Sequence, residues 1–346
     1  MSEVVDHLAE LTGFRDRDVL DVTLVSAFRD LLRPDSVTIY RPVGESGNFR
    51  WLTRARLRAH EAAPSADSIW ADHDDLPAME TLPSHQRCLE QQSAVLLQSD
   101  GQAMSLFPLA TDRDTCGVLE IRTPAALTPE QSRLVSSILR VYRNFQGLLD
   151  YSERDTLTGL LNRKTFDGSF LRVATQSPSE GTVSAAGVQD LRQAGASDTA
   201  WLGVVDIDHF KSVNDNHGHL IGDEVLLLIA RLMRSSFRFQ DQLYRFGGEE
   251  FVVLLRCADV KQAQAAFERL RSNVENYIFP RVGRITVSVG FTELRTGDSP
   301  SSAFERADKA VYHAKQNGRN QVAHHGDLIA RGMLVEEART GDMELF

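Results

Sequence analysis

Two pairs of acidic residues stand where strands of the second half of the chain are expected to end. Asp206 and Asp208 lie at the end of the apolar, β-branched run 201–207, which is typical of a buried strand. Glu249 and Glu250 follow a Gly-Gly pair that predicts a tight hairpin, because a type I′ turn needs positive φ at both central positions. A single acidic pair usually only turns the chain. Two pairs on neighbouring strands predict carboxylates gathered at one edge of a sheet.

Carboxylates on rigid strands predict a magnesium site for a phosphate-bearing substrate. Mg²⁺ takes one or two protein carboxylates and fills its other positions with water and substrate phosphates. Two such ions can activate an attacking 3′-hydroxyl and hold a triphosphate. The acidic pairs therefore predict chemistry at a phosphate group.

Length and charge set the broad class of the protein. The 346 residues exceed what one compact core usually holds, which predicts two domains. Apolar residues make up 42% and charged residues 25%, as in an ordinary globular protein. The formal net charge of −10 argues against a nucleic-acid binder, which needs a basic face. A nucleotide substrate is compatible with this charge, because a metal ion and a few cations can hold a triphosphate.

The chain carries no signal for a membrane or an oxidising compartment. No run approaches the roughly 20 apolar residues that span a bilayer, and the acidic N-terminus lacks the apolar segment of a secretory signal. We therefore expect no membrane span and a cytoplasmic location. Cys88, Cys116 and Cys257 are far apart, with no CxxC spacing. They are interpreted as reduced, mostly buried residues rather than as a disulfide or zinc framework.

Residues 1–125 have the pattern of a small sensory domain. A helix is predicted at 18–32, and alternating apolar residues predict strands at 36–43 and 49–57. The polar stretch at 58–82 predicts a loop. The segment FPLATDRDTCGVLEIRTP resembles a late hairpin of GAF domains, with a PAS-like domain as the alternative. A further helix is expected at 83–92, and further strands at 94–98, 103–110 and 116–123.

Residues 126–153 are predicted to form a connecting helix that starts with a capping box at Thr128. Its apolar residues recur at steps of three and four, at Leu134, Ile138, Val141, Phe145 and Leu148. Such a stripe fits either a helix packed on its own domain or a parallel coiled coil between two protomers. The coiled-coil stalk is slightly favoured.

The second half alternates helices and strands, beginning with a helix near Asn162. The small, polar residues 174–200 predict a long, mobile insertion. The order strand, helix, hairpin, helix, strand predicts an α/β (α+β) domain with a ferredoxin-like or polymerase-palm sheet. Helices are expected at 223–237, 260–277 and 301–316, and a strand at 285–291.

Four segments resemble the signature segments of GGDEF domains and occur in that family's order. They are DTLTGLLNR at 155–163, DIDHFKSVNDNHGHLIGD at 206–223, RFGGEEF at 245–251 and ADKAVYHAKQNGRN at 307–320. The resemblance implies a diguanylate cyclase domain at 154–323, followed by a tail at 324–346. Such a domain joins two GTP into cyclic di-GMP and two pyrophosphates. The GGEEF variant is one that active members use.

The resemblance also implies roles for single residues, carried over by position. Asp206 and Glu249 resemble the metal-binding carboxylates, with the carbonyl of Ile207 as a third ligand. Glu250 resembles the acid beside the metal, which helps to deprotonate or orient the 3′-hydroxyl. The implied cofactor is Mg²⁺, for which Mn²⁺ can substitute.

Asn214 and Asp223 match the guanine-reading pair of the family. A carboxylate accepts hydrogen bonds from guanine N1–H and N2–H₂, whereas adenine would present a lone pair to it, so such a site rejects adenine strongly. The substrate-binding set is completed by the cations Lys211, Lys315 and Arg319, which resemble the phosphate-holding residues, and by His209 and Phe210. Lys315 and Arg319 lie close together if the last helix reaches Arg319, although Gly318 can end it earlier.

Arg238 and Asp241 lie shortly before the GGEEF segment as an RxxD sequence. An exposed ion pair at a helix end would contribute little. The family interpretation is a product site, in which the arginine forks onto a guanine or phosphate and the aspartate accepts from the base. Arg269 or Arg271 on the next helix would supply a second cation. Cyclic di-GMP is then expected as an inhibitor as well as the product.

One GGDEF site holds one GTP and the product needs two attacks, so the resemblance implies a homodimer. An unknown ligand or signal at the N-terminal domain would change how often the dimer becomes competent. Two alternatives are a non-catalytic sensor of cyclic di-GMP and a scaffold dominated by the N-terminal domain. The HGH at 217–219 and the pair His324-His325 are interpreted as local hydrogen-bonding and solvated residues, without a metal.

Overall fold

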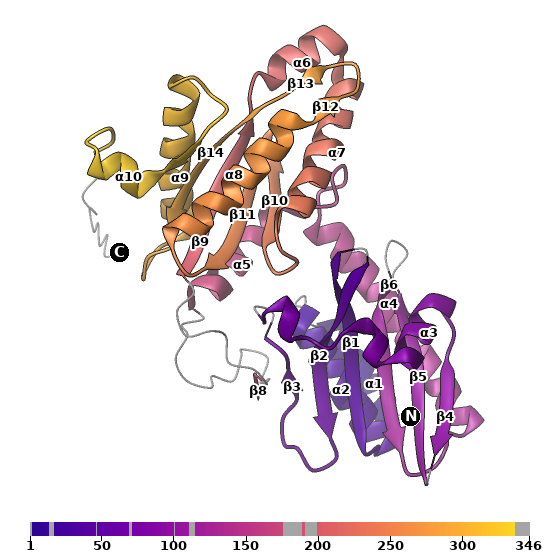
Figure 1. The fold of residues 1–346 in the computed structure, drawn as a ribbon. Helices are drawn as coiled ribbons and strands as arrows, with labels where there is room; N and C mark the ends of the chain where they lie inside the picture. Colours follow the sequence, from indigo (N-terminus) through magenta and orange to yellow (C-terminus); the bar gives the residue numbers. More distant parts are fainter. Residues whose placement is uncertain are drawn as a thin grey trace. The chain divides into compact units, whose positions relative to one another are not determined.

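A computed structural model of the chain shows two compact units (Figure 1). One unit comprises Met1–Glu153 with Pro178–Ala196, and the other Arg154–Ser177 with Ser197–Phe346. Most of the predicted insertion at 174–200 and the last part of the tail lie outside the described residues. The structure describes residues 2–13, 17–45, 47–68, 71–99, 101–110, 115–175, 189–190 and 199–335.

The N-terminal unit is built on a seven-stranded sheet in the order β4-β5-β6-β1-β2-β3-β8 (Figure 1). Its strands are β1 (Ser36–Glu45), β2 (Asn48–Arg58), β3 (Ser65–Ala66), β4 (Val95–Ser99), β5 (Gln102–Ala110), β6 (Thr115–Thr123) and β8 (Gln189–Asp190). β1 pairs antiparallel with β2 and β6, whereas β8 pairs parallel with β3. The strands predicted in this unit are confirmed. The stretch 58–82, predicted as loop, also contains β3 and two short 3₁₀ helices, η1 (His73–Asp75) and η2 (Met79–Thr81).

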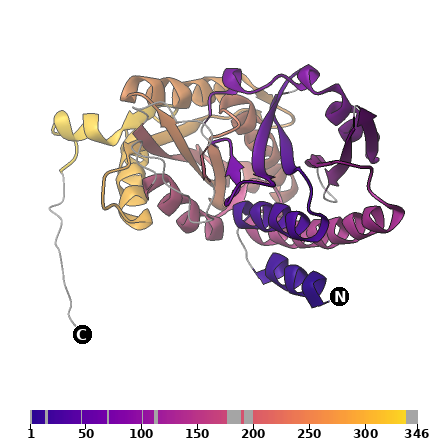
Figure 2. The same ribbon diagram turned by 90° about the horizontal axis from the view of Figure 1, so that it is seen from below.

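Helices lie on both faces of this sheet. They are α1 (Ser2–Gly13), α2 (Arg17–Leu32), α3 (Pro83–Gln91) and α4 (Pro129–Glu153). α1, α2 and α4 lie side by side (Figure 2), and apolar residues such as Leu24 and Ile138 pack with Ile39 and Ile121 of the sheet. On the other face, Cys88 of α3 packs with apolar residues that include Trp51. Cys88 is a buried free thiol, as is Cys257 of the other unit, which confirms the cysteine prediction for these two.

α4 begins with the predicted capping box, closed by Gln131. The amide N–H of Gln131 donates to Thr128 Oγ1 at 3.2 Å, and the N–H of Thr128 donates to Gln131 Oε1 at 2.9 Å. Ile138 is buried in the core of its own unit, and Phe145 packs against that core, whereas Leu148 is 65% exposed. Most of the predicted apolar stripe therefore packs on the N-terminal unit, which is the first of the two interpretations of this helix.

A buried polar network also holds α4 on its unit. Asp21 of α2 has no exposed surface and accepts hydrogen bonds from Arg41 at 3.1 Å and from the Tyr142 hydroxyl of α4. Arg17 donates to Asp150 at 2.8 Å and to Glu153 at 2.6 Å, near the end of the helix. Charged hydrogen bonds of this kind are the stronger ones, and they tie the connecting helix to α2 and the sheet.

The C-terminal unit has a six-stranded sheet in the order β15-β14-β9-β11-β10-β7 (Figure 1). Its strands are β7 (Leu161–Asn162), β9 (Thr199–Ile207), β10 (Gln242–Gly247), β11 (Glu250–Cys257), β14 (Val287–Glu293) and β15 (Val322–His324), and β12 (Ile278–Phe279) pairs with β13 (Gly283–Arg284). The four neighbours β14, β9, β11 and β10 are antiparallel. They follow the predicted chain order of strand, helix, hairpin, helix, strand, in a mixed α/β fold.

Helices cover both faces of this sheet as well. They are α5 (Arg163–Thr175), α6 (Phe210–His217), α7 (His219–Ser236), α8 (Val260–Asn276), α9 (Pro300–Gln316) and α10 (His325–Ala330). Ile229 of α7 and Phe267 of α8 pack with Val205 and Val253 in the main core. α9 contacts β14, β9 and α5 (Figure 1). The sheet is thus fixed between helices, and its strand ends have little freedom to move.

Two helices of this unit, α6 and α7, differ from the sequence prediction, whereas α9 ends at the predicted residue. α6 was not predicted, because it is short and only two of its eight residues, Phe210 and Val213, are apolar. α7 begins at His219 rather than at 223, because Gly218 with φ +82° separates it from α6. α9 ends at Gln316, and Arg319 has a left-handed backbone with φ +60°. Lys315 and Arg319 therefore do not share a helix face.

Among the described residues, no helix is long and apolar enough to cross a bilayer.

Candidate active site

The acidic residues predicted to cluster do meet at one edge of the C-terminal sheet. In the ladder between β9 and β11, Asp206 lies directly opposite Glu250, and the N–H of Ile207 donates to the carbonyl of Glu249 at 3.4 Å. The hairpin turn lies one residue later than predicted. Gly247 pairs with Glu250, so Glu249 is in the turn itself and not at the start of a strand. A single register step therefore sets the different positions of Glu249 and Glu250.

Crowding and burial raise the proton affinity of these carboxylates. Burial raises the pKa of Asp206, against the ion pair with Lys315, which lowers it. Burial and the negative charge of Asp206 both raise the pKa values of Glu249 and Glu250. Asp308 of α9 adds to the repulsion on Glu250. The site thus has an excess of negative charge that a bound cation would relieve.

Asp206 has one oxygen paired and one oxygen unpaired. Oδ2 lies 2.7 Å from the Nζ of Lys315, whereas Oδ1 is buried and makes no hydrogen bond. A buried unpaired carboxylate oxygen is costly and is usually explained by an ion or a ligand. Within the described ranges no group of three or more His, Cys, Asp or Glu side chains is close enough to hold a metal. The unpaired Oδ1 of Asp206 fits a magnesium ion held by few carboxylates, a backbone carbonyl and substrate oxygens.

Asn214 and Asp223 face the substrate side without partners of their own. In the part of the chain that the structure describes, neither side chain has a hydrogen bond. Gly222 lets α6 and α7 approach closely, because a Cβ at this position would lie 2.0 Å from Asn214 Oδ1. The absent side chain leaves room for the Asn214 amide next to Asp223. The two groups are available to a base.

The remaining predicted substrate residues differ in their setting. Lys211 is exposed on α6. Arg319 is exposed and lies in the turn after α9. His209 has φ +57° at the corner between β9 and α6, and Phe210 is buried with 5% exposure. Phe210 is thus part of the core beneath the site, and its side chain is not available to a substrate as predicted.

Asp208 has a different role from Asp206. It is 4% exposed and accepts hydrogen bonds from Thr286 Oγ1 at 2.6 Å, Ser288 Oγ at 2.7 Å and the backbone N–H of Asn320 at 3.1 Å. Both of its oxygens are therefore occupied by protein donors. Sequence analysis assigned no role to Asp208, since its partners Ser288 and Asn320 lie 80 and 112 positions later in the chain.

The DTLTGLLNR segment contacts the hairpin formed by β10 and β11 and holds it in place. Asp155 accepts from the Thr158 hydroxyl at 2.6 Å and from Arg245 of β10 at 3.1 Å. Burial opposes ionisation, but these partners hold the pKa of Asp155 below its usual range. Arg163 lies 5.5 Å from the ring centre of Phe246 and its charge acts on Glu250. Sequence analysis gave Arg163 and Asp308 no role.

The RxxD segment lies between α7 and β10. Asp241 accepts from the backbone N–H of Arg238 at 2.8 Å, and the side chain of Arg238 is exposed. Burial raises the pKa of Asp241 to about 6, while Arg238 and Arg269 act to lower it. Arg269 is anchored by a bond to the carbonyl of Ser236 at 2.7 Å. Arg271 instead pairs with glutamates on its own helix, so Arg269 is the second cation nearest to this segment.

The prediction that His324 and His325 are solvated is wrong. His325 is 3% exposed, and His324 stacks on the ring of Phe291 with 4.8 Å between ring centres. His324 ends β15 and lies against the rings of Trp201 and Phe291, and His325 begins α10. Such packing is not visible in a local sequence pattern. His217 and His219 are exposed, and the local hydrogen bonding expected of the HGH sequence stays a prediction.

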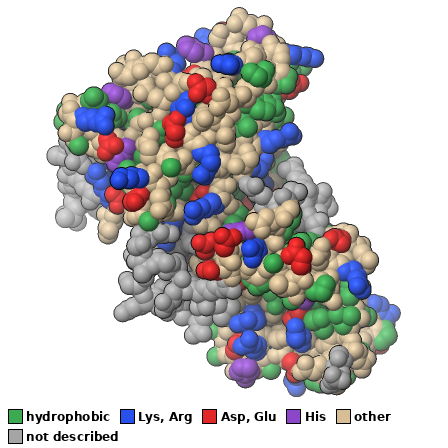
Figure 3. All heavy atoms as spheres, viewed as in Figure 1, with side chains coloured by type: hydrophobic (Ala, Val, Ile, Leu, Met, Phe, Trp, Pro, Cys, Tyr) green, Lys and Arg blue, Asp and Glu red, His purple; other side chains and the backbone are tan. Residues whose placement is uncertain are grey.

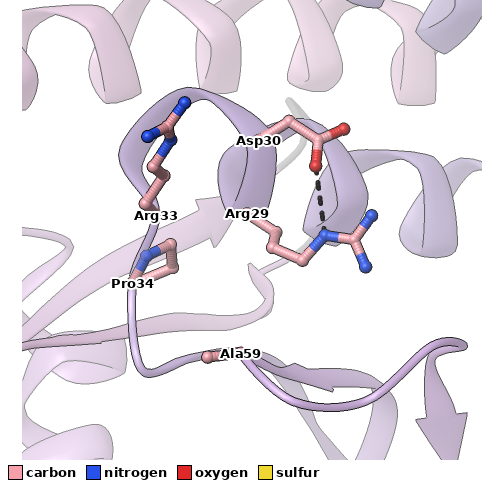
Figure 4. A pocket seen from close by; sticks show the side chains of 5 residues that line it. All are labelled: Arg29, Asp30, Arg33, Pro34 and Ala59. Carbon is pink, nitrogen blue, oxygen red and sulfur yellow. Dashed lines mark hydrogen bonds and ion pairs between the residues drawn. The ribbon is translucent and has the colours of Figure 1, made fainter.

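Two surface features lie outside the acidic site. A pocket of about 380 Å³ in the N-terminal unit is lined by Arg29, Asp30, Arg33, Pro34 and Ala59 (Figure 4). The Nε of Arg29 donates to Asp30 at 3.1 Å, so the charge of one of the two arginines that line the pocket is already neutralised. On the described face in Figure 3, Lys and Arg side chains are interspersed with Asp and Glu, and no continuous basic area is visible.

The C-terminal unit is similar to known proteins. Residues 152–321 match the family model "Diguanylate cyclase, GGDEF domain". The curated protein "Diguanylate cyclase DgcP" of Pseudomonas aeruginosa is 44% identical over 124 residues, which are 35% of this chain and 18% of that protein. "Diguanylate cyclase VdcA" of Vibrio cholerae is 35% identical over 203 residues, 57% of this chain and 52% of that protein. The chain thus spans about half or less of the length of these two relatives.

One solved structure matches part of the chain. The coiled coil and GGDEF domain of DgcB from Caulobacter crescentus, in complex with c-di-GMP, is 29% identical, with a TM-score of 0.46. The match covers 57% of this chain and 100% of that one. Residues 152–321, which contain the four signature segments and the edge carboxylates, are thus similar in sequence to GGDEF domains.

Proposed function

We propose that this protein is a diguanylate cyclase, which condenses two GTP into cyclic di-GMP and two pyrophosphates. The observation that carries the proposal is the buried, unpaired Oδ1 of Asp206 opposite Glu250, close to a GGEEF hairpin. The family of residues 152–321 and its curated relatives point to the same reaction.

Magnesium would be held by Asp206, Glu249 and the carbonyl of Ile207. When bound, it would neutralise the triphosphate and lower the pKa of the attacking hydroxyl. Glu250 would accept or orient the proton of the 3′-hydroxyl, since its raised pKa suits a general base better than an ordinary carboxylate. Lys315 lies within reach of Asp206 and would exchange that partner for a phosphate oxygen when GTP enters.

Guanine would be selected by Asn214 and Asp223. Both side chains lack protein partners, so each can pair fully with a base edge. Adenine would leave the Asp223 carboxylate opposite a lone pair, and a site that buries an unpaired charge discriminates strongly. Lys211 and Arg319 are exposed cations that would steady the triphosphate.

The reaction requires two copies of the domain. Each GTP provides a 3′-hydroxyl and an α-phosphate, and the ring closes only when two sites face each other. We therefore propose a homodimer, at least during turnover. The N-terminal unit, which we propose to be GAF-like, would control how often the two sites meet. Its mainly antiparallel sheet, with α1, α2 and α4 on one face and α3 on the other, supports this assignment. Since GTP is a cytoplasmic substrate, we expect the domain to act there.

Product inhibition would act through Arg238, Asp241 and Arg269. The exposed Arg238 is available to fork onto a guanine or a phosphate, and Asp241 would accept from the base. Bound cyclic di-GMP would join this segment to a cation on another domain or protomer and hold the active sites apart.

One experiment separates this function from its two alternatives. Purified protein is incubated with GTP and Mg²⁺, and the nucleotides are separated to detect cyclic di-GMP. A diguanylate cyclase forms it, whereas a non-catalytic sensor only binds it and a scaffold does neither. The matched control is Asp206→Asn, which keeps the side-chain volume and removes a metal-ligand charge. Formation of product by this control at the wild-type rate would remove the proposed metal site.

A further inference from the structure

We propose that Asp208 is a positioning residue that holds the phosphate-binding turn after α9 in place, rather than a ligand of the metal. This inference rests on the proposed function, because it assigns a role toward the triphosphate of GTP. It starts from the contrast between two aspartates that are two residues apart. Asp206 leaves Oδ1 without any partner, whereas both oxygens of Asp208 accept hydrogen bonds from the protein.

The hydrogen-bond donors to Asp208 come from two segments far along the chain, the start of β14 and the turn after α9. Thr286, just before β14, and Ser288 within it donate their hydroxyls at 2.6 and 2.7 Å. The backbone N–H of Asn320 donates at 3.1 Å. Asp208 also donates its own N–H to the carbonyl of Thr286 at 2.9 Å. The carboxylate is 4% exposed, so these bonds form in a place that excludes water and are worth more than surface bonds.

The bond to Asn320 restrains a turn with an unusual backbone. Gly318, Arg319 and Asn320 all have positive φ, at +104°, +60° and +44°. Two consecutive non-glycine residues in the left-handed region cost free energy and persist only when the surroundings hold them. The Asp208 carboxylate is one such restraint, and it acts on the residue that follows Arg319.

Asn320 is held from its other side by α8. Its Oδ1 accepts from Arg271 at 2.8 Å, and its Nδ2 donates to Glu275 at 2.8 Å. The turn is thus tied to α8 by a side chain and to the corner after β9 by its backbone. Between these ties, the exposed side chain of Arg319 is the group left to meet a ligand. Asp208 therefore acts on substrate through Arg319, and it does not need to touch the substrate itself.

A metal-ligand role and a positioning role predict opposite results for Asp208→Asn. The asparagine carbonyl can accept from Thr286 and Asn320, and its NH₂ can donate to the Ser288 hydroxyl, which is able to act as an acceptor. All three bonds survive without the negative charge. Asp208→Ala loses all three. For a positioning residue, Asp208→Asn recovers most of the GTP affinity that Asp208→Ala loses.

The test measures KM for GTP, kcat and the Mg²⁺ requirement for these variants. Asp208→Ala is expected to raise KM by about tenfold, the loss of one charge-assisted phosphate contact, with a smaller change in kcat. Arg319→Ala should raise KM by a similar factor. Because both act through the same contact, the double variant should be no worse than Arg319→Ala by more than about twofold. Multiplying effects would overturn the inference.

Asp298→Ala is the matched structural control. Asp298 has a side chain 1% exposed and accepts from Arg306 at 2.6 Å and from the N–H of Arg295 at 2.7 Å, at the start of α9. Its loss should lower the melting temperature without raising KM. If Asp208→Ala does not fold, Thr286→Val removes one donor at constant volume and should still raise KM about twofold. An unchanged KM in Asp208→Ala, or in Thr286→Val where Asp208→Ala does not fold, would overturn the inference.

Failure of the proposed function is recognised separately. If wild-type protein makes no cyclic di-GMP, calorimetry with a non-hydrolysable GTP analogue and Mg²⁺ reports the same contact. Weaker binding by Asp208→Ala, recovered in Asp208→Asn, supports the inference without any turnover. Absence of analogue binding by the wild type overturns it. Loss of turnover in Asp208→Asn together with a higher Mg²⁺ requirement would instead make Asp208 a metal ligand.

Discussion

The Nζ of Lys315 lies 2.7 Å from Oδ2 of Asp206, while the other oxygen of the same carboxylate is buried and unpaired. One residue of this pair stands at the end of a strand and the other near the end of a helix. The ion pair only partly offsets the burial of Asp206, whose pKa remains raised. A cation bound at Oδ1 would offset the remaining cost of burying the charged Asp206 carboxylate.

Asp206→Asn is expected to abolish cyclic di-GMP formation while the domain stays folded. The change removes a metal-ligand charge at nearly constant volume, and loss of a direct ligand should cost at least about 100-fold in rate. Turnover is measured with GTP and Mg²⁺, and folding by circular dichroism. Asp215→Asn, an exposed neighbour on α6, serves as the control and should retain activity. Equal turnover by both variants would place the metal elsewhere.

Asp223→Ala is expected to narrow the preference for GTP over ATP. The carboxylate is the group that repels adenine N1, so its removal weakens GTP use and relieves the penalty against ATP. Competition between the two nucleotides for product formation or binding gives the ratio. Glu224→Ala, the next residue on the same exposed turn of α7, should leave the ratio as it is. If Asp223→Ala behaves like this control, the base is read by other residues.

Cyclic di-GMP affinity is expected to fall as the pH is lowered through about 6. Burial raises the pKa of Asp241 to about 6 in the folded protein, above its ordinary value of 3.8. Below this pH the carboxylate takes up a proton and loses an acceptor for the guanine N–H groups. Because the folded pKa is the higher one, the same proton uptake stabilises the fold as the pH falls from about 6 to about 4.

Calorimetry at pH 7.5 and 5.5 checks the affinity, with Asp241→Asn as the control that has no carboxyl to titrate at this position. A pH-independent affinity in wild type would mean that Asp241 does not contact the ligand.

Arg238→Ala is expected to relieve feedback inhibition. Loss of the guanidinium fork removes a charge-assisted pair worth on the order of 1.5–3 kcal/mol, or tenfold or more in product affinity. The variant should continue past the product concentration at which the wild type slows, with a similar initial rate. Progress curves at equal GTP decide the matter. Curves that reach a plateau together would reduce the RxxD sequence to a surface feature.

Tyr142→Phe is expected to destabilise the N-terminal unit by about 1–2 kcal/mol. The Tyr142 hydroxyl donates to the fully buried Asp21, and its loss leaves a buried carboxylate with one donor fewer. Thermal unfolding measures the change. Tyr151→Phe on the same helix removes a hydroxyl from a side chain that is 71% exposed and should have no effect. Equal melting temperatures for both variants would show that the Asp21 network does not hold α4.

The sequence was sufficient for features that depend on local patterns. The run ending at Asp206 and the Gly-Gly pair before Glu249 predicted two strands and a shared edge, because apolar periodicity and glycine conformations are encoded locally. The position of the turn was wrong by one residue, since register depends on the partner strand. That single step separates Glu249 in the turn from Glu250 in the strand.

Other features required contacts between distant parts of the chain. Asp206 and Asp208 are indistinguishable by residue type, and only the fold shows that Asp206 keeps one unpaired oxygen while Asp208 accepts three hydrogen bonds. Phe210 was predicted to touch the substrate but is buried, because α6 turns it toward the core. His325 was predicted to be solvated, but it is the first residue of α10 and its side chain is 3% exposed. Burial follows from tertiary packing and cannot be derived from a short segment.

The absence of a Cβ atom at Gly222 leaves the space that the Asn214 amide occupies beside α7. A Cβ there would fall 2.0 Å from Asn214 Oδ1 and 3.4 Å from the ring of Phe210. Even alanine would therefore push the Asn214 amide away from Asp223, while both of these residues remained unchanged in the sequence. A relative with the complete set of signature residues but a side chain at this one position would be expected to lose guanine recognition. A search for the signature letters would not detect that loss.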